Sequence, residues 1–261
     1  MLAKLRYCLL SAAIWGSLVG FLGSPAIAAS EQPIRPGEQE KAERLIRQFC
    51  SFLRSQNAFT VEADITYDNV LSGGQKVQYA AFQKVILVRP DRLRVEYTGD
   101  QRRTLFVYDG KSFLWLNTAK NLYLARPTAS TVDAMVPALS EELGIELPLS
   151  NLVTGEPCRK ASENIVSAYY VGEGFVGRTL ADHILVIGKD RTWQLWLNKE
   201  KEFEPVPLKI VITYSDLPEA PQYTAVFSNW NFNPQITDKD FSTTPPEGAL
   251  RIEALPTVSK P

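Results

Sequence analysis

The chain has 261 residues, with 28 Lys and Arg against 29 Asp and Glu and a formal net charge of −1. No basic tract stands out, so the composition predicts no nucleic-acid partner. The length suits one large β domain or two small ones, and a single histidine excludes a metal site built from several histidines.

The first predicted element is a secretory signal peptide over residues 1–28. Lys4 and Arg6 form a short basic region, an uncharged apolar run follows over residues 7–22, and an Ala-Ile-Ala sequence ends at Ala28. We expect cleavage after Ala28, export to the periplasm, and no stable membrane span after processing. An uncleaved membrane anchor is the alternative, because the run is only slightly shorter than the roughly 20 residues that span a bilayer.

A flexible lead-in is predicted over residues 29–37, which are polar and hold two prolines. A helix is predicted over residues 38–55, because apolar residues recur there at three- and four-residue spacing. Cys50 lies beside the apolar face of this helix, and Cys158 is the other cysteine that follows the leader. An oxidising compartment favours a disulfide between the two, and two buried free thiols are the alternative.

Strands are predicted from residue 59 onward. Over residues 59–68 every odd position is apolar and every even one polar, which is typical of a strand with one dry face. Asp109-Gly110 is the strongest hairpin signal, because both residues tolerate the positive φ angles of a tight turn. The predicted strands are 59–68, 76–88, 93–97, 104–108, 113–116, 121–125, 165–175, 179–187, 192–197, 207–214 and 222–231.

Helical spacing returns between residues 131 and 143. Ser130, Thr131 or Asp133 could cap this central helix, and Pro137 should kink it or split it in two. A second short apolar element follows, over residues 147–153.

The order of these elements predicts a single, mainly antiparallel β domain over residues 38–250, with a large curved sheet or an open barrel. Neither a repeat nor a linker divides it. The chain from Pro245 onward is rich in proline, and we expect a loosely ordered tail over residues 251–261.

Apolar side chains exceed what one interface between a sheet and a helix can bury. Strands 113–116 and 192–197 are partly apolar on both faces. The N-terminal helix can cover one face, and the other needs a lid, a partner or a ligand; the central helix is the candidate lid. Either the two helices close an ordinary core, or a cavity accepts an acyl chain or an apolar peptide. The candidate ligand-binding residues are Trp115, Tyr123, Val132, Met135, Leu139, Leu143 and Trp193.

The residues that catalysis needs are scarce. His183 is the only histidine, and a lone histidine in a strand is more often structural than catalytic. The sequence has no Gly-x-Ser-x-Gly elbow, no P-loop and no Cys-x-x-Cys pair. We therefore predict no enzyme activity, no catalytic residue, no metal and no cofactor, and a secreted hydrolase that uses His183 is the least favoured alternative.

Seven motifs between about residues 40 and 250 mark turns and strand edges: RPDRLRV at 89–95, YDGK at 108–111, GIELPL at 144–149, WQLWL at 193–197, PLKIVITY at 207–214, PQYTA at 221–225 and FSTTPP at 241–246. They resemble a bacterial family of predicted periplasmic proteins with a domain of unknown function, which is similar to the LolA, LolB and RseB-like lipoprotein carriers.

The resemblance implies an unclosed β-barrel of about 10 to 11 strands, with the N-terminal helix and the central helical lid covering its concave side. It implies a carrier or chaperone that holds a lipid, an acyl chain or a lipoprotein in that hollow. An envelope sensor of the RseB type, which binds a peptide or lipid and a partner protein, is the alternative. The motifs carry no catalytic residues over to this chain.

Overall fold

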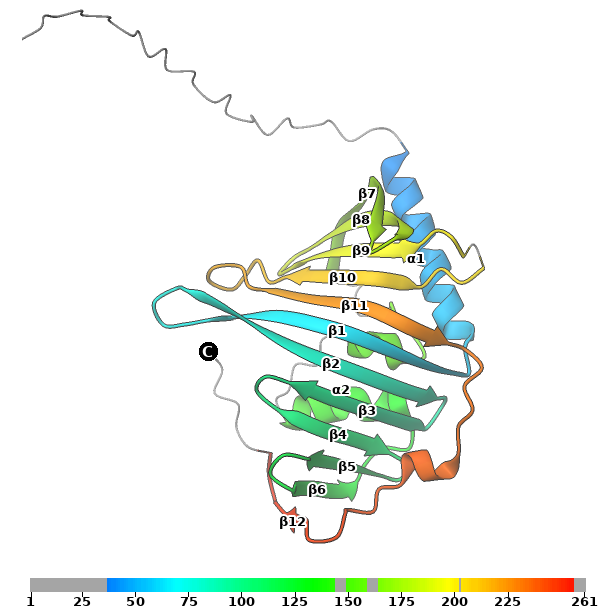
Figure 1. Ribbon diagram of the computed structural model, residues 1–261. Helices are drawn as coiled ribbons and strands as arrows, with labels where there is room; N and C mark the ends of the chain where they lie inside the picture. Colours follow the sequence, from blue (N-terminus) through cyan, green and yellow to red (C-terminus); the bar gives the residue numbers. More distant parts are fainter. Residues whose placement is uncertain (1–36, 144–148, 159–163, 202, 256–261) are drawn as a thin grey trace, which may run out of the picture. The chain divides into compact units, whose positions relative to one another are not determined.

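The computed structural model describes residues 37–143, 149–158, 164–201 and 203–255 (Figure 1). The predicted signal peptide with its cleavage site at Ala28, nearly all of the lead-in, and the end of the tail lie outside the described residues. The same is true of the side chain of Leu143.

Twelve strands form one sheet in the order β12-β6-β5-β4-β3-β2-β1-β11-β10-β9-β8-β7 (Figure 1). All neighbouring strands are antiparallel except β12, which runs parallel to β6. The two outermost described strands do not pair with each other, so the sheet is unclosed. The predicted fold class, an unclosed antiparallel sheet with two helices, is confirmed. The elements are α1 (Glu38–Ser55), β1 (Ala58–Val70), β2 (Lys76–Val88), β3 (Arg92–Gly99), β4 (Arg103–Tyr108), β5 (Ser112–Asn117), β6 (Leu122–Pro127), α2 (Val132–Leu143), η1 (Ser150–Val153), β7 (Ile165–Val176), β8 (Thr179–Gly188), β9 (Thr192–Asn198), β10 (Pro207–Thr213), β11 (Gln222–Asn231), η2 (Asp238–Phe241) and β12 (Leu250–Arg251).

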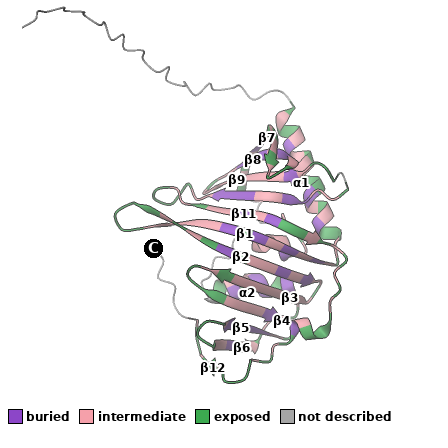
Figure 2. Cartoon of the chain, viewed as in Figure 1, coloured by how far each residue is buried: buried purple, intermediate pink, exposed green. Residues whose placement is uncertain are grey.

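Alternation along the strands separates two faces of the sheet. In β1, Phe59, Val61, Ala63 and Ile65 are buried, and the polar residues between them are more exposed. We call the face that carries these four side chains the inner face, and the opposite one the outer face. Exposed positions gather at hairpin tips such as the β1–β2 turn (Figure 2).

Both helices cover the inner face. α1 buries Phe49 and Leu53 in one apolar cluster, and α2 lies in a second, larger one. Trp193 and Trp230 pack against both clusters, so the clusters share one side of the sheet. The expectation that each helix covers a different face is therefore wrong, and the arrangement implied by the family resemblance is the one observed.

The outer face of β4, β5 and β6 is covered by part of the C-terminal segment, residues 236–249. Phe241 of η2 packs with Val107, Leu114 and Leu116, and all four side chains are buried. This contact accounts for the apolar residues on both sides of β5, because one side meets the inner cluster and the other meets Phe241.

The expected loosely ordered tail begins with a strand instead. The backbone N–H of Leu250 donates to the carbonyl of Asn121 at 2.9 Å, and that of Ile252 donates to Tyr123 at 2.8 Å. Ile252 and Leu255 also pack against the inner cluster. An exposed edge of β6 offers unpaired backbone groups, and β12 satisfies part of that edge. The prolines near residue 245 gave no sign of this two-residue strand.

The central helix is a single helix, and it is not split at Pro137. The Thr131 hydroxyl accepts a hydrogen bond from the Ala134 N–H at 3.2 Å, so Thr131 is the cap among the three predicted. Burial of the apolar face of α2 offsets the free-energy cost of the backbone hydrogen bond that Pro137 cannot donate.

Candidate functional site

The apolar side of α2 lies at the centre of the inner face. Val132, Met135, Val136 and Leu139 are each at most 6% exposed, and they belong to one cluster with residues of β1, β2, β3, β4, β5, β6, β10 and β11. The central helix therefore occupies the place that the sequence assigns to a lipophilic ligand or its lid.

Five of the seven predicted ligand-site residues come together in this cluster. Val132, Met135 and Leu139 are in its buried part, and Trp115 and Trp193 pack against it while partly buried. Leu143 ends α2, and its side chain lies outside the described residues.

Tyr123 lies elsewhere. It packs against the outer cluster formed with Phe241, on the side of the sheet away from α2. In β6 the inward residue is its neighbour Leu124, which pairs with Trp115 across the β5–β6 ladder. Successive residues of a strand point to opposite faces. The sequence prediction placed Tyr123 at the ligand site, but because Leu124 points inward, the side chain of Tyr123 points away from α2.

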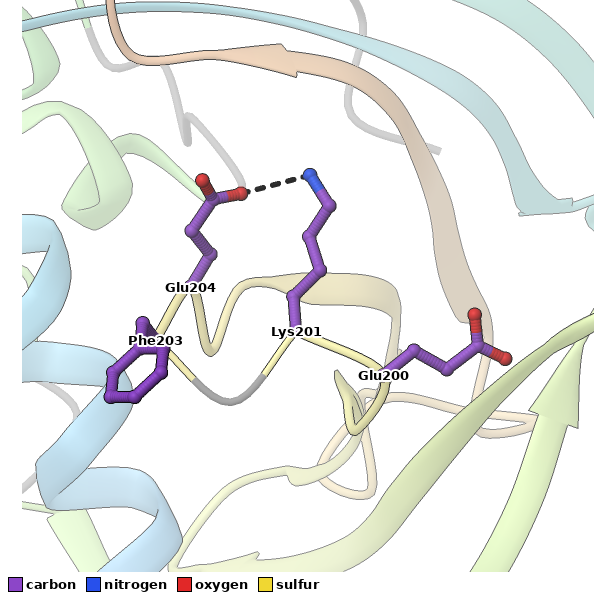
Figure 3. Close-up of a pocket in the computed structure, with 4 residues that line it drawn as sticks. All are labelled: Glu200, Lys201, Phe203 and Glu204. Carbon is purple, nitrogen blue, oxygen red and sulfur yellow. Dashed lines mark hydrogen bonds and ion pairs between the residues drawn. The ribbon is translucent and has the colours of Figure 1, made fainter.

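A surface depression of 470 Å³ lies in the loop between β9 and β10, lined by Glu200, Lys201, Phe203 and Glu204 (Figure 3). The Lys201 ammonium and a Glu204 carboxylate oxygen are 2.9 Å apart, and Phe203 is 86% exposed. None of the predicted ligand-site residues lines this depression. Lys201 and Glu204 already neutralise each other, and a ligand here would only replace water at their exposed atoms. The inner face is therefore the better candidate for the site.

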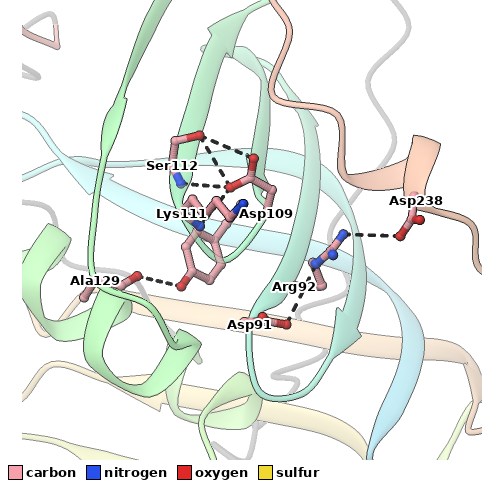
Figure 4. Close-up of polar contacts among 8 residues, drawn as sticks. Asp91, Arg92, Asp109, Lys111, Ser112, Ala129 and Asp238 are labelled. Carbon is pink, nitrogen blue, oxygen red and sulfur yellow. Dashed lines mark hydrogen bonds and ion pairs between the residues drawn. The ribbon is translucent and has the colours of Figure 1, made fainter.

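Hydrogen bonds fix the start of α2. The Val132 N–H donates to the carbonyl of Pro90 at 2.8 Å. The phenol of Tyr108, a fully buried residue, donates to the carbonyl of Ala129 at 2.6 Å (Figure 4). Burial, together with the nearby carboxylates of Asp91 and Asp109, raises the pKa of Tyr108, so the phenol keeps its proton and remains a donor.

An ion pair lies near the other end of α2. An Arg126 guanidinium nitrogen lies 2.9 Å from a Glu142 carboxylate oxygen, and both side chains are partly exposed. An exposed ion pair of this kind contributes about 0–1 kcal/mol. Near the first turn, Asp133 accepts a hydrogen bond from the Gly155 N–H at 2.6 Å. Buried apolar side chains and the hydrogen bonds at its first turn thus both hold the helix.

Arg89 joins three parts of the fold at the end of β2. Its Nε donates to the carbonyl of Gln56, just after α1, at 3.0 Å, and its Nη1 donates to the carbonyl of Val153 in η1 at 2.9 Å. Its Nη2 is buried without a hydrogen-bond partner among the described residues. Burial lowers the pKa of Arg89, and the Asp133 carboxylate opposes that shift. The sequence offered one signal of this role, a charged residue between an apolar run and a proline.

The Asp109-Gly110 hairpin is present and links β4 to β5. Gly110 has φ 88°, in the left-handed region that favours glycine. Although burial acts in the opposite direction, hydrogen bonds from the backbone N–H groups of Ser112 and Lys111 lower the pKa of Asp109 (Figure 4). The Thr243 hydroxyl also donates to this carboxylate at 3.1 Å, so the turn anchors the C-terminal segment.

His183 lies on the outer face and has structural contacts. Its ring stacks on Trp196 with 4.0 Å between the ring centroids, and its Nε2 lies 3.0 Å from Oε1 of Gln194. Burial lowers the pKa of His183. These two contacts are with an indole and an amide. A nucleophile–base pair would instead need a hydroxyl or thiol beside the imidazole.

A disulfide joins Cys50 of α1 to Cys158, and their Cα atoms are 5.9 Å apart. The bond ties α1 to the segment that follows η1. The pairing is the one that the cysteine count favoured, and it closes a loop with a sequence separation of 108 residues.

A family model described as "Predicted periplasmic protein (DUF2092)" matches residues 42–255. No curated protein matches the chain. Within the described residues, no helix is both long and apolar enough to cross a membrane.

Solved structures with a similar fold share little sequence with this chain. The LolA superfamily protein NE2245 from Nitrosomonas europaea is 11% identical, with a TM-score of 0.39, over 77% of this chain and 97% of that one. The lipoprotein LppX from Mycobacterium tuberculosis is 11% identical, with a TM-score of 0.42, over 76% and 99%. The MucA/MucB complex of Pseudomonas aeruginosa gives 13% identity and a TM-score of 0.42 over 77% and 61%.

Proposed function

The chain belongs to the family of predicted periplasmic proteins (DUF2092), and from this premise we propose that it is an exported, non-enzymatic protein that binds a lipophilic ligand. The ligand is a lipid, an acyl chain or the lipid part of a lipoprotein, and it lies between α2 and the inner face of the sheet. The protein acts as a carrier or chaperone for this cargo.

The observation that carries the proposal is the way in which α2 is held. Burying one large apolar side chain contributes about 1.5–3 kcal/mol, so the four buried side chains of α2 contribute roughly 6–12 kcal/mol. A methylene group contributes about 0.8 kcal/mol, so an acyl chain with about 15 methylenes offsets roughly 12 kcal/mol. A single acyl chain can therefore replace the contacts that α2 makes with the sheet.

Three features support export. The N-terminal sequence has the pattern of a secretory leader, the family is described as periplasmic, and the chain contains the Cys50–Cys158 disulfide. Disulfides persist in oxidising compartments such as the periplasm.

The test is to purify the full chain from the periplasm and to identify bound lipid by native mass spectrometry. A fluorescent fatty acid then reports uptake into the emptied protein. We expect one bound lipid per chain and displacement of the probe by long-chain lipids. Folded protein that carries no lipid and takes up no probe would contradict the proposal.

Two leucines give matched variants for this test. Leu139→Ala removes a buried side chain of α2 on the inner face, and Leu114→Ala removes one from the outer cluster. Each should destabilise the fold by about 2–5 kcal/mol. Only Leu139→Ala should change the affinity for the probe, and equal changes in both variants would count against the inner face as the ligand site.

A second candidate is an envelope sensor that binds a peptide or lipid and passes a signal to a partner protein. The observation that favours it is the outermost strand β7, where Val166, Val171 and Phe175 are 64%, 56% and 70% exposed. An edge strand with exposed apolar side chains can add a strand from another protein. Capture of one envelope protein by the lipid-free chain, lost on Phe175→Ser, would favour this function over transport.

A further inference from the structure

Five tyrosines lie at the end of the inner face near the β1–β2 hairpin, where the Tyr79 ring contacts that of Tyr67, and four of them pack against the inner cluster. These four are Tyr67, Tyr97, Tyr214 and Tyr223, which we call the tyrosine cluster, and all four are partly buried. Tyr67 of β1 pairs with Tyr223 of β11 across the ladder, and its phenol donates to Oε1 of Gln101 at 3.1 Å. The opposite end of the inner face, near Phe59, carries aromatic rings without this concentration of hydroxyls.

The phenols of Tyr67 and Tyr223 keep their protons at neutral pH. Burial, together with a hydrogen bond to the neighbouring Tyr97 phenol, raises the pKa of Tyr67 to about 12. Burial raises the pKa of Tyr223 as well. Neutral phenols in a half-buried place are hydrogen-bond donors for an acceptor that arrives with a ligand.

Arg102 places a positive charge beside these donors. Its guanidinium lies 4.9 Å from the centre of the Tyr97 ring, and its charge acts against the raised pKa values of Tyr67 and Tyr223. In the described part of the chain, no carboxylate forms an ion pair with Arg102. Asp100 also acts on Tyr67, but its carboxylate accepts a hydrogen bond from the Ala80 N–H at 2.7 Å.

The second guanidinium near the cluster differs from the first. Arg191 lies 5.0 Å from the centre of the Tyr214 ring and is paired with Asp190, with 2.7 Å between nitrogen and oxygen. The charge of Arg191 is therefore compensated locally, and Arg102 is the cation that remains available to a ligand at this end.

We propose that the tyrosine cluster and Arg102 hold the anionic headgroup of the lipophilic ligand, a phosphate or a carboxylate, while its acyl chains lie along the inner face. This inference rests on the proposed function and narrows its ligand to anionic amphiphiles. A guanidinium binds phosphate and carboxylate oxygens through paired, charge-assisted hydrogen bonds. The neutral phenol of Tyr223 donates to a remaining oxygen, Tyr67 can exchange its hydrogen bond to Gln101 for another, and the apolar inner face receives the chains.

The test compares lipids with identical acyl chains: phosphatidylglycerol with an anionic headgroup, and diacylglycerol without one. The emptied full-length protein should bind phosphatidylglycerol about tenfold more tightly, because a hydrogen bond to a charged group is worth that much or more. Arg102→Gln should abolish this preference and leave the affinity for diacylglycerol unchanged. Inorganic phosphate at millimolar concentration should not displace the lipid.

Arg103→Gln is the matched control. It removes the same charge one residue along, in β4, where the alternation places residue 103 with Leu105 on the outer face. This variant should keep the preference, and circular dichroism should show that both variants fold.

Each other outcome is decisive. Equal binding of the two lipids by the wild-type chain, or a preference that survives Arg102→Gln, overturns the headgroup site but leaves the proposed function standing. Displacement by inorganic phosphate shows a site for free anions and also overturns the inference. Failure of every lipid to bind overturns the proposed function, and the headgroup site with it.

Discussion

The two helices cover the same face of one sheet but are attached to it in different ways. α1 carries Cys50, and the disulfide to Cys158 ties the helix covalently to the segment after η1. α2 is held by buried apolar side chains and by hydrogen bonds at its first turn. Non-covalent contacts can be exchanged for equal contacts with a ligand, whereas a covalent bond cannot. If the proposed ligand site is correct, α1 is the fixed cover and α2 the movable one.

The largest effect should come from the covalent tie. Replacing Cys50 and Cys158 together with serine should lower the free energy of unfolding by about 4–5 kcal/mol, because the bond closes a long loop in the unfolded chain. Urea unfolding checks this, and the reduced wild-type chain is the control. Lipid affinity should stay unchanged while the variant is folded. A variant as stable as the oxidised chain would contradict the role given to α1.

The next effect should come from Arg89, which joins the segments that follow the two helices to the sheet. Arg89→Met removes the donors to Gln56 and Val153 and should cost about 2–3 kcal/mol, because hydrogen bonds from a charged group are strong. Arg92→Met is the control, since Arg92 pairs with the exposed Asp238. If both variants lose the same free energy of unfolding, Arg89 is not a junction.

A smaller effect should follow from loosening the start of α2. Tyr108→Phe keeps the buried ring and removes one hydrogen bond to the carbonyl of Ala129, at a cost of about 1 kcal/mol. If α2 is the movable cover, the fluorescent fatty acid should enter faster. An unchanged entry rate, measured by stopped flow, would argue that this bond does not hold the helix.

The smallest effect should come from the other end of α2. Glu142→Gln removes the exposed ion pair with Arg126 and should change the free energy of unfolding by less than about 1 kcal/mol. Thermal unfolding at low and at high salt measures it. A loss of several kcal/mol would mean that the end of α2 is held as firmly as its start.

The sequence predicted the elements of this fold well where the side-chain pattern is long. β1 and β2 each show many alternating positions, and Asp109-Gly110 is a sequence typical of a tight hairpin turn. Both hairpins could therefore be predicted from the sequence alone. Both helices follow from apolar residues at helical spacing, and Thr131 is one of the caps expected.

What the sequence missed depends on contacts between distant residues. Tyr123 lies in a strand of six residues, where a shift of one position exchanges the two faces. The two-residue strand β12 exists because β6 offers an open edge. The role of Arg89 depends on carbonyl groups 33 and 64 residues away; its neighbours in the sequence mark it as unusual but do not show which carbonyls it contacts.

Hydrogen–deuterium exchange of the full chain, with and without saturating phosphatidylglycerol, tests the central claim most directly. Bound lipid should change the exchange of amides in α2 and in the inner strands beneath it, and should leave those of α1 as they were. Lipid binding that alters α1 and α2 alike, or that changes only the loop around Phe203, would contradict a ligand site under a movable α2.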